Sequence, residues 1–416
     1  MPDPRGRTYP PITFFFLHIC TAWPVGVVGL ALGSSMVTAG MSVRHSAAII
    51  AASTLAFTLE FIWAPIVDSS LTRRLWYVVG AVVMCGCLAM LLISPWDAAS
   101  VPLLTALAFG SSSGAAVAAV AAKGLMAYDV PTTQLGSASG FYTAGGTFAK
   151  AVGGAGTLWL LTHLSGRTPA ASLSVGCAAL SGLAILIASP GLPVPLRELS
   201  EKLRYALADL WSFVRSREGV MIAVLCVIPF GAGTEAGLIG AIAHEWNVAP
   251  DQLASFSVFG AAISIIGAIF AGWLSTRVGP WTVYVLLGWT MIAVILCFAY
   301  APRNAAYFIV IELFYRALAS GCYAALLGIV MTAIGKGAAS TKAAGMWSLA
   351  NFAVVYPALL EGSIHDSNGT RAMLLTDAGL GAAGFAVLLV ASRLLKVRPN
   401  ASIASGTPLV AREQRS

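Results

Sequence analysis

The stretch LWYVVGAVVMCGCLAMLLI, residues 75 to 93, contains no charged side chain. As a helix it would rise about 28 Å, close to the ~30 Å hydrocarbon core of a bilayer. Similar runs recur along the 416 residues, of which 58% are hydrophobic and 10% charged, whereas soluble domains carry about 25% charged residues. The runs do not alternate polar and apolar residues as barrel strands do. The sequence therefore predicts an all-α polytopic membrane protein.

Twelve apolar runs can be distinguished, six on each side of a polar gap. They predict two six-helix halves, residues 1–189 and 219–394, with a linker at 190–218 and a disordered tail at 395–416. The predicted spans are Ile12–Val37, Ala47–Val67, Leu75–Ile93, Val101–Ala122, Ala138–Leu161, Ala170–Ala188, Val220–Ile242, Leu253–Leu274, Trp281–Tyr300, Tyr307–Ile334, Ala343–Leu360 and Ala372–Ser392.

Basic residues are unevenly divided between the predicted loops. Most of them, Lys123 included, fall on the side of the two termini, and this bias places both termini in the cytoplasm. Leucines between Leu196 and Leu210 recur at helical spacing, which predicts an amphipathic helix on the cytoplasmic surface. The formal charge of +7 therefore reflects membrane topology and not nucleic-acid binding. The loops on the opposite side carry Arg44, Arg167, Arg303 and Arg371.

The first and seventh predicted helices share a pattern of one proline followed by several glycines. The prolines are Pro24 and Pro229, about two hundred residues apart. Similar loops after the second and eighth helices have nearly the same separation, which indicates two homologous halves. Paired Gly/Pro-interrupted helices point to a transporter's central cavity. The alternative is ordinary close packing, since both residues are frequent in membrane helices.

The loop after the second helix resembles the signature loop of the major facilitator superfamily, G-x-x-x-D-R/K-x-G-x-R/K-R/K. Asp68 stands at its acidic position, and Arg73 and Arg74 stand at its last two basic positions. Ala64 replaces the small glycine and Ser69 the first basic residue. The resemblance implies that these charges gate the cytoplasmic side; alternatively they only set topology. In the second half the matching residues are Gly272, Arg277 and Gly279, with Thr276 in place of the acid.

The string FTLEFIWAPIVD, residues 57 to 68, is similar to the muropeptide permease, acetyl-CoA transporter and siderophore importer group of that superfamily. Tyr142 begins a Y-x-A-G element that also resembles this group. The sequence departs from the group at Glu60, where its members show lysine, and at Lys123, near which they show acids. The resemblance implies an amphiphilic organic substrate and a proton as the coupling ion.

Few ionisable groups lie inside the predicted spans, where each is costly and marks a pathway or a paired contact. Glu60 and Lys150 have opposite signs in one half, and we expect them to pair, either for proton coupling or as a static bridge. Glu235 follows the break in the seventh helix and is either a coupling carboxylate or a packing group. Glu312 and Arg316 are spaced for a salt bridge on one helix face, although Arg316 would also suit an anionic substrate.

The remaining candidates are residues that could line a central cavity. His18 is either a packing group or a proton relay. The aromatic candidates could stack on an organic substrate or simply pack between helices. With the two prolines of the interrupted helices, the cavity-lining candidates are Trp23, Pro24, Tyr142, Pro229, Trp347 and Tyr356.

No hydrolase, kinase, dinucleotide-binding or zinc-site motif occurs, so the sequence predicts no enzyme, cofactor or metal site. We expect a monomeric secondary transporter in a bacterial inner membrane, which imports an amphiphilic organic solute together with protons. The open alternatives are efflux of a drug or metabolite, a non-transporting relative, and a membrane-embedded transferase.

Overall fold

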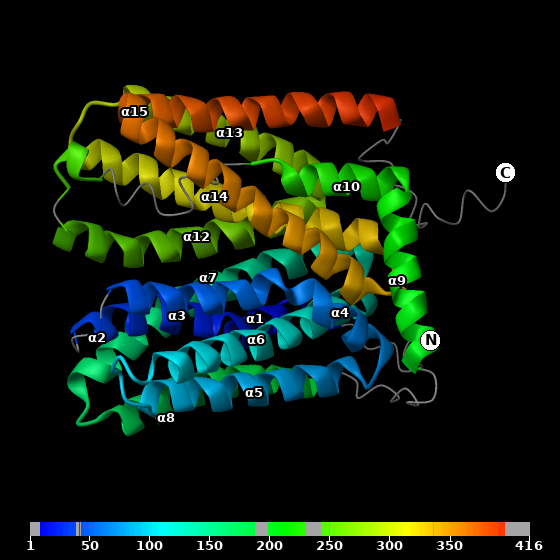
Figure 1. Cartoon of the computed structure of the whole chain (residues 1–416). Helices are drawn as coiled ribbons and strands as arrows, with labels where there is room; N and C mark the ends of the chain where they lie inside the picture. Colours follow the sequence, from blue (N-terminus) through cyan, green and yellow to red (C-terminus); the bar gives the residue numbers. More distant parts are fainter. Residues whose placement is uncertain are drawn as a thin grey trace. The chain divides into compact units, whose positions relative to one another are not determined.

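The computed structural model describes residues 9–38, 41, 43–187, 199–229, 243–248, 250–335 and 337–395, and no β-strand occurs among them (Figure 1). The longer elements are α1 (Thr13–Gly26), the π-helix η1 (Val27–Leu32), α3 (Val43–Thr58), α4 (Glu60–Ser69), α5 (Arg73–Ile93), α6 (Val101–Asp129), α7 (Leu135–His163), α8 (Arg167–Gly182), α9 (Leu199–Arg215), α10 (Arg217–Val227), α12 (Pro250–Val278), α13 (Pro280–Tyr300), α14 (Ala305–Ile334) and α15 (Ala339–Leu395).

In the part of the chain that the structure describes, 8 helical stretches are long and apolar enough to cross a bilayer, or 9 if one bent pair counts as a span. The predicted spans Ala138–Leu161 and Ala343–Leu360 are helical too, within α7 and α15. The predicted seventh span is described only as far as Pro229, after the end of α10. The all-α polytopic class predicted from the sequence is confirmed.

Contacts divide the chain into two compact units. The first comprises residues 1–130, 145–210 and 336–348, and the second 131–144, 211–335 and 349–416. In the first unit α5 and α1 each pack against α6 and α8 (Figure 1). In the second unit α14 packs against α10, α12 and α13. The boundaries of these two units differ from those of the predicted six-helix halves, residues 1–189 and 219–394. The two halves therefore remain a prediction.

Small residues allow close helix packing inside the first unit. A Cβ at Gly80 of α5 would lie 2.5 Å from the carbonyl oxygen of Gly114 and 2.8 Å from the amide nitrogen of Ala118, both on α6. Near this contact the hydroxyl of Ser111 donates to the carbonyl of Met84 over 3.2 Å. Because lipid tails are as apolar as leucine, such backbone approach and hydrogen bonding hold membrane helices together.

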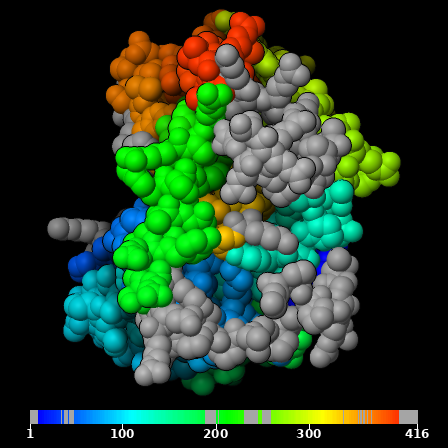
Figure 2. Space-filling view, turned by 90° about the vertical axis from the view of Figure 1, so that its right-hand side faces the viewer, coloured from blue at the N-terminus to red at the C-terminus, as the bar shows by residue number. Residues whose placement is uncertain are grey.

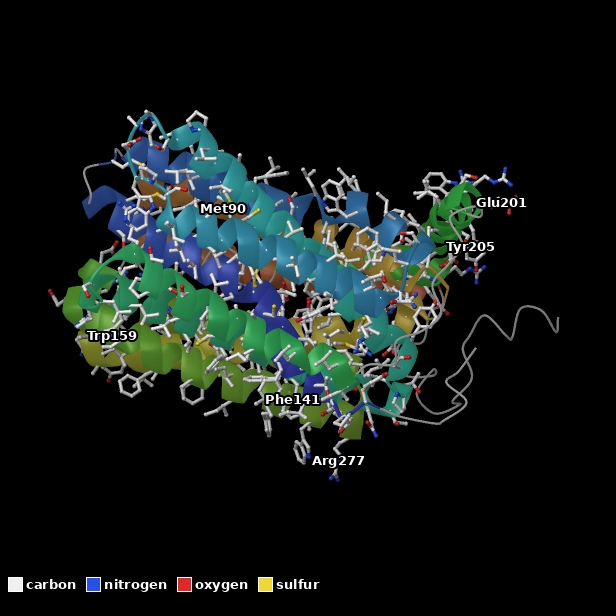
Figure 3. The ribbon with its side chains drawn as sticks, turned by 90° about the horizontal axis from the view of Figure 1, so that it is seen from below. Met90, Phe141, Trp159, Glu201, Tyr205 and Arg277 are labelled. Atoms are coloured by element: carbon white, nitrogen blue, oxygen red, sulfur yellow. The ribbon has the colours of Figure 1, made fainter. Side chains whose placement is uncertain are left out.

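The outer faces of the units carry apolar side chains, as helices bordered by lipid require. Met90 of α5 and Trp159 of α7 are 57% and 56% exposed, and Figure 3 shows both on the outside of the ribbon. Helix α9 lies in the segment where an amphipathic helix was predicted, and it is exposed at the surface (Figure 2). Its Tyr205 and Trp211 are 61% and 58% exposed, which suits a helix resting on the bilayer interface.

Candidate functional site

The second predicted span, Ala47–Val67, is not one straight helix. Two helical stretches, Ala48–Thr58 and Glu60–Ser69, meet at an angle of 42°. The backbone of Leu59, between the two stretches, departs from helical geometry, with φ −87° and ψ 7°. The bend falls in the turns before Pro65, whose ring cannot fit against the preceding turn of a straight helix.

Glu60 lies directly after this break, in the first turn of α4. Its Oε1 accepts a hydrogen bond from Lys123 Nζ of α6 at 2.7 Å, and the two side chains are only 2% and 3% exposed. The N-terminal end of α4 is the positive end of the helix dipole, which favours a negative charge. The lysine and the helix end therefore both stabilise an ionised carboxylate inside an apolar helix bundle.

The start of α15 supplies the other walls of this site. Lys123 Nζ lies 5.2 Å from the ring centroid of Trp347, within cation–π range. The hydroxyl of Ser348 donates to the carbonyl of Thr58, at the helix break, over 3.4 Å. We call Glu60, Lys123, Trp347 and Ser348 the broken-helix site.

The predicted pairing of Glu60 with Lys150 is wrong. Lys150 is exposed, and none of the ion pairs between described residues involves it. Lys123, which was predicted to lie in a cytoplasmic loop, takes its place because α6 continues past the predicted end at Ala122 to Asp129. The apolar letters Gly-Leu-Met-Ala after Lys123 were the available signal that the helix continues.

Asp68 at the end of α4 makes several contacts inside the first unit. It forms an ion pair with Arg73 at 3.3 Å. Its Oδ2 accepts hydrogen bonds from the amide of Thr341 at 2.7 Å and from the Thr341 hydroxyl at 2.9 Å. Asp68 therefore caps the first turn of α15. The signature-loop resemblance implied a gating role for Asp68 but did not identify Thr341 as its partner. Arg74 is half-buried.

A second acid holds the same helix start. Asp209 of α9 accepts from the amide of Ala338 at 2.8 Å and forms an ion pair with Lys342 at 3.0 Å. Tyr128, whose ring carries the Arg73 guanidinium at 3.9 Å, accepts from the amide of Gly337 at 2.9 Å. Two carboxylates and one phenol thus fasten residues 337–342.

The interrupted first helix is packed closely. Pro24 lies inside α1, and the π-helix η1 follows directly after the next turn. Trp23 is buried and donates to Ser174 of α8 at 3.1 Å. A Cβ at Gly146 would lie 2.4 Å from the ring of His18, so that ring packs against α7. These positions favour the packing interpretation for Trp23 and His18.

The second unit confirms the salt bridge on α14. Arg316 Nε lies 2.7 Å from Glu312 Oε1, and the glutamate is 3% exposed while the arginine is 35% exposed. The other carboxylate oxygen of Glu312 has no hydrogen-bond partner. Because a third of its side chain is open, Arg316 could still meet an anion.

The other candidates in the second unit have mixed outcomes. Pro229 is buried just after α10, and the hydroxyl of Tyr356 donates to the carbonyl of Val227 at 2.9 Å. Tyr142 is 2% exposed. Glu235 lies outside the described residues, so its role stays a prediction. Arg277, at the outer end of α12, projects away from the ribbon and lies 5.3 Å from the ring of Trp273 (Figure 3).

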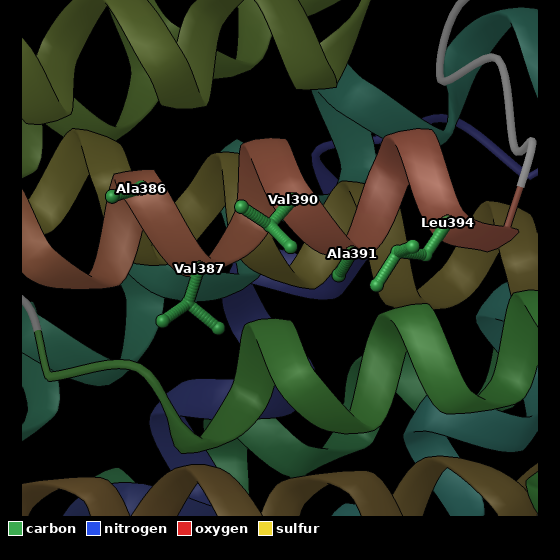
Figure 4. Close-up of a pocket in the computed structure, with 5 residues that line it drawn as sticks. All are labelled: Ala386, Val387, Val390, Ala391 and Leu394. Atoms are coloured by element: carbon green, nitrogen blue, oxygen red, sulfur yellow. The ribbon is translucent and has the colours of Figure 1, made fainter.

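An open apolar pocket on α15 is unsuited to binding a polar solute. It is lined by aliphatic side chains only, so it offers a solute no hydrogen bond and no charge, and an acyl chain would suit it better (Figure 4). Among the described residues no group of three or more His, Cys, Asp or Glu side chains could hold a metal ion. The lining residues are Ala386, Val387, Val390, Ala391 and Leu394.

Solved structures of transporters have similar folds. The E. coli fucose:proton symporter FucP has a TM-score of 0.69 and 14% identity, covering 93% of this chain and 98% of that chain. A bacterial homologue of the iron transporter ferroportin, in its outward-facing state with soaked iron, has a TM-score of 0.67 and 12% identity, covering 94% of this chain and 100% of that chain. The human organic anion transporter TETRAN has a TM-score of 0.64 and 16% identity, covering 93% and 100%.

Comparisons of sequence find fewer matches than comparisons of structure. No curated protein matches the chain significantly. The sequence profile described as Major Facilitator Superfamily matches residues 14–351, which is most of the chain. Because this profile covers well over half of the chain, the chain belongs to the major facilitator superfamily, and it is a transporter rather than an enzyme.

Proposed function

We propose that this transporter imports an amphiphilic organic solute into a bacterial cell together with protons, by alternating access, with both termini in the cytoplasm. The observation that carries the proposal is the buried Glu60–Lys123 pair at a helix break, beside Trp347. A buried ion pair adds little to stability, since desolvation offsets much of the attraction. Its retention in an apolar bundle favours a functional role.

The chemistry of the broken-helix site suits a substrate that carries a carboxylate and an apolar body. When the Glu60 carboxylate takes up a proton or swings away, Lys123 is left without its anionic partner, and a substrate carboxylate can replace it. Trp347 offers an aromatic face to the apolar part of the same molecule. A muropeptide and many siderophores carry carboxylates, whereas the anionic groups of an acyl-CoA are phosphates, which the Lys123 ammonium would bind in the same way. Two fold neighbours are named for an organic anion and for proton symport.

Alternating access requires one side to close while the other opens, and the contacts of Asp68 and Asp209 supply a latch for this purpose. Both acids bind the start of α15, the helix that also carries Trp347 and Ser348. Release of Thr341 and Ala338 would therefore move two walls of the broken-helix site. This is the gating role that we propose for Asp68 and Arg73.

The test is uptake of a labelled panel of muropeptide, acyl-CoA and siderophore into proteoliposomes, with and without an inward proton gradient. The informative variant is Lys123→Met, and Lys150→Met is its matched control because that lysine is exposed. We expect gradient-driven accumulation of one compound, a loss of at least tenfold in Lys123→Met, and no comparable loss in Lys150→Met.

Other results would change the proposal. Gradient-driven expulsion of a preloaded compound would establish efflux in place of import. No movement of any compound in either direction, by protein shown to be folded, would favour a non-transporting member of the superfamily. Equal losses in the two lysine variants would refute the role of the broken-helix site.

A further inference from the structure

Helix α14 carries a polar face that the broken-helix site does not involve. Glu312, Arg316 and Ser320 follow one another at intervals of four residues, so their side chains lie on one side of the helix. Val310 and Phe314, which are 55% and 62% exposed, each stand two residues from Glu312 and therefore lie on nearly the opposite side. The polar face thus points away from the side of α14 that borders lipid.

The ion pair on this face uses only part of each charged group. Arg316 Nε lies 2.7 Å from Glu312 Oε1, while Glu312 Oε2 is shielded from solvent and has no hydrogen-bond partner among the described residues. The two terminal nitrogens of Arg316 carry four more N–H donors, and none of these bonds to a described residue. Arginine and carboxylate often pair through two parallel hydrogen bonds, which would satisfy both oxygens. Here the forked end of the arginine is left available.

The neighbouring helix α12 fixes the place of this arginine. A Cβ at Gly260 would lie 2.7 Å from Arg316 Cδ and 3.1 Å from its Nε, so a larger residue would push the side chain aside. The hydroxyl of Ser264 donates to the carbonyl of Arg316 over 3.4 Å. Two turns further along α12, a Cβ at Gly267 would overlap the carbonyl oxygen of Ala317, so the two helices touch through their backbones. The arginine is therefore held in place although its side chain is 35% exposed.

Ser320 adds a hydrogen-bond donor on the same face. A serine hydroxyl inside a helix often donates to the carbonyl four residues earlier, which here belongs to Arg316. That carbonyl accepts from Ser264 instead, and Ser320 Oγ has no hydrogen-bond partner in the described part of the chain. Residues four apart on a helix have Cβ atoms about 5–6 Å from each other. Rotation of the Ser320 side chain would therefore bring its hydroxyl to an anion held by Arg316.

The ligand that these groups fit is a carboxylate or a phosphate group. A guanidinium is planar and permanently charged, and its fork matches two oxygens of either group. An anion at the terminal nitrogens of Arg316 lies closer to the positive guanidinium than to Glu312 beyond Nε, so attraction outweighs repulsion. Glu312 holds Nε and thereby keeps the fork turned outward, which makes it a positioning residue.

We propose that Arg316, positioned by Glu312 and assisted by Ser320, is an anion-binding site of the second unit that takes the carboxylate or phosphate group of the transported solute. The inference rests on the proposed function and adds a second anchor for an anionic group. Because Arg316 is 35% exposed and Lys123 only 3%, Arg316 takes this group before the Glu60–Lys123 pair opens. The solute is held by ionic hydrogen bonds, and no covalent bond is made or broken.

The first experiment does not depend on transport. Phenylglyoxal, which modifies accessible arginine side chains, is applied to the purified protein, and modified peptides are quantified by mass spectrometry. The probes are benzoate, phenyl phosphate and the uncharged benzyl alcohol. We expect at least one of the anions to slow modification of Arg316 at least fivefold, and benzyl alcohol to leave it unchanged. Arg303 is the internal control, because it is 37% exposed and also lies near a glutamate, and its modification should not respond to the probes.

The anion that protects Arg316 identifies the group that the site takes, and protection by both means that it accepts either. Two glycine variants test the position of the arginine. A Cβ at Gly260 would meet the Arg316 side chain, whereas a Cβ at Gly379 would meet nothing within 4 Å. Gly260→Ala keeps both charges and should lose most of the protection, because the guanidinium is displaced. Gly379→Ala should retain the protection of the wild-type protein.

The second experiment uses proteoliposomes and the compound found in the uptake panel. Arg316→Lys keeps the positive charge beside Glu312 but replaces the planar fork by a single ammonium group. We expect its KM for uptake to rise at least tenfold, with a smaller change in the maximal rate, which also shows that the variant is folded. Arg303→Lys is the matched control and should have the KM of the wild-type protein.

Three results would each overturn the proposal. They are failure of both anions to protect Arg316, equal protection by benzyl alcohol or in Gly260→Ala, and an unchanged KM in Arg316→Lys. If the wild-type protein moves none of the compounds, the proposed function fails, and the protection experiment alone decides whether the anion site exists.

Discussion

At the scale of single residues, one buried lysine changes the interpretation of the sequence. Lys123 was assigned to a loop because a cationic letter at the end of an apolar run usually marks the membrane boundary. The structure pairs it with Glu60 at 2.7 Å inside the bundle. The presence of both charges was visible in the sequence, but their pairing depends on which helices are neighbours, and no local pattern encodes that.

This pairing makes a prediction about stability. Lys123→Met leaves the Glu60 carboxylate buried without its partner, and removal of one member of a buried pair costs about 3–5 kcal/mol. We expect a marked drop in the melting temperature of the detergent-solubilised protein. The double variant Glu60→Gln/Lys123→Met should recover most of the loss, because no buried charge remains unpaired. A double variant as unstable as the single one would show that the pair is not what the lysine stabilises.

At the scale of elements, Gly80 and Gly86 provide a matched comparison on one helix. A Cβ at Gly80 would meet the backbone of α6 at 2.5 Å, whereas a Cβ at Gly86 would meet nothing within 4 Å. Backbone atoms cannot move aside, so we expect Gly80→Ala to cost about 1–3 kcal/mol through overpacking. Gly86→Ala should be neutral or slightly stabilising, because alanine favours the helix. Thermal unfolding of the two variants checks this, and similar melting temperatures would contradict the close α5–α6 contact.

The elements also show where prediction from sequence stops. Apolar runs were enough to place most helices, because length and hydrophobicity are local properties. The bend at Leu59 was not predicted, since the letter itself is neither glycine nor proline and its cause, Pro65, lies more than a turn later. The capping of Thr341 by Asp68 joins residues far apart in the chain, so it required the fold.

At the scale of the whole molecule, transport requires helices to change partners. The hydrogen bonds at the start of α15 are contacts whose opening can be measured. Asp68 accepts from the amide of Thr341, and Asp209 accepts from the amide of Ala338. Hydrogen bonds to a charged acceptor contribute about 1.5–3 kcal/mol, which corresponds to roughly 10- to 100-fold in an opening equilibrium. Amide hydrogen exchange reports such opening residue by residue.

We therefore expect a pattern of exchange that distinguishes two separate contacts from one cooperative latch. If the contacts open independently, Asp68→Ala raises exchange mainly at Thr341, and Asp209→Ala raises it mainly at Ala338. Alternating access requires the opposite result, because a helix that leaves as a unit exposes both amides together. Each variant should then raise exchange at both amides by a similar factor, within that 10- to 100-fold range, as measured by exchange coupled to mass spectrometry. A strictly local effect of each substitution would mean that these acids only cap a fixed helix and that the gate lies elsewhere.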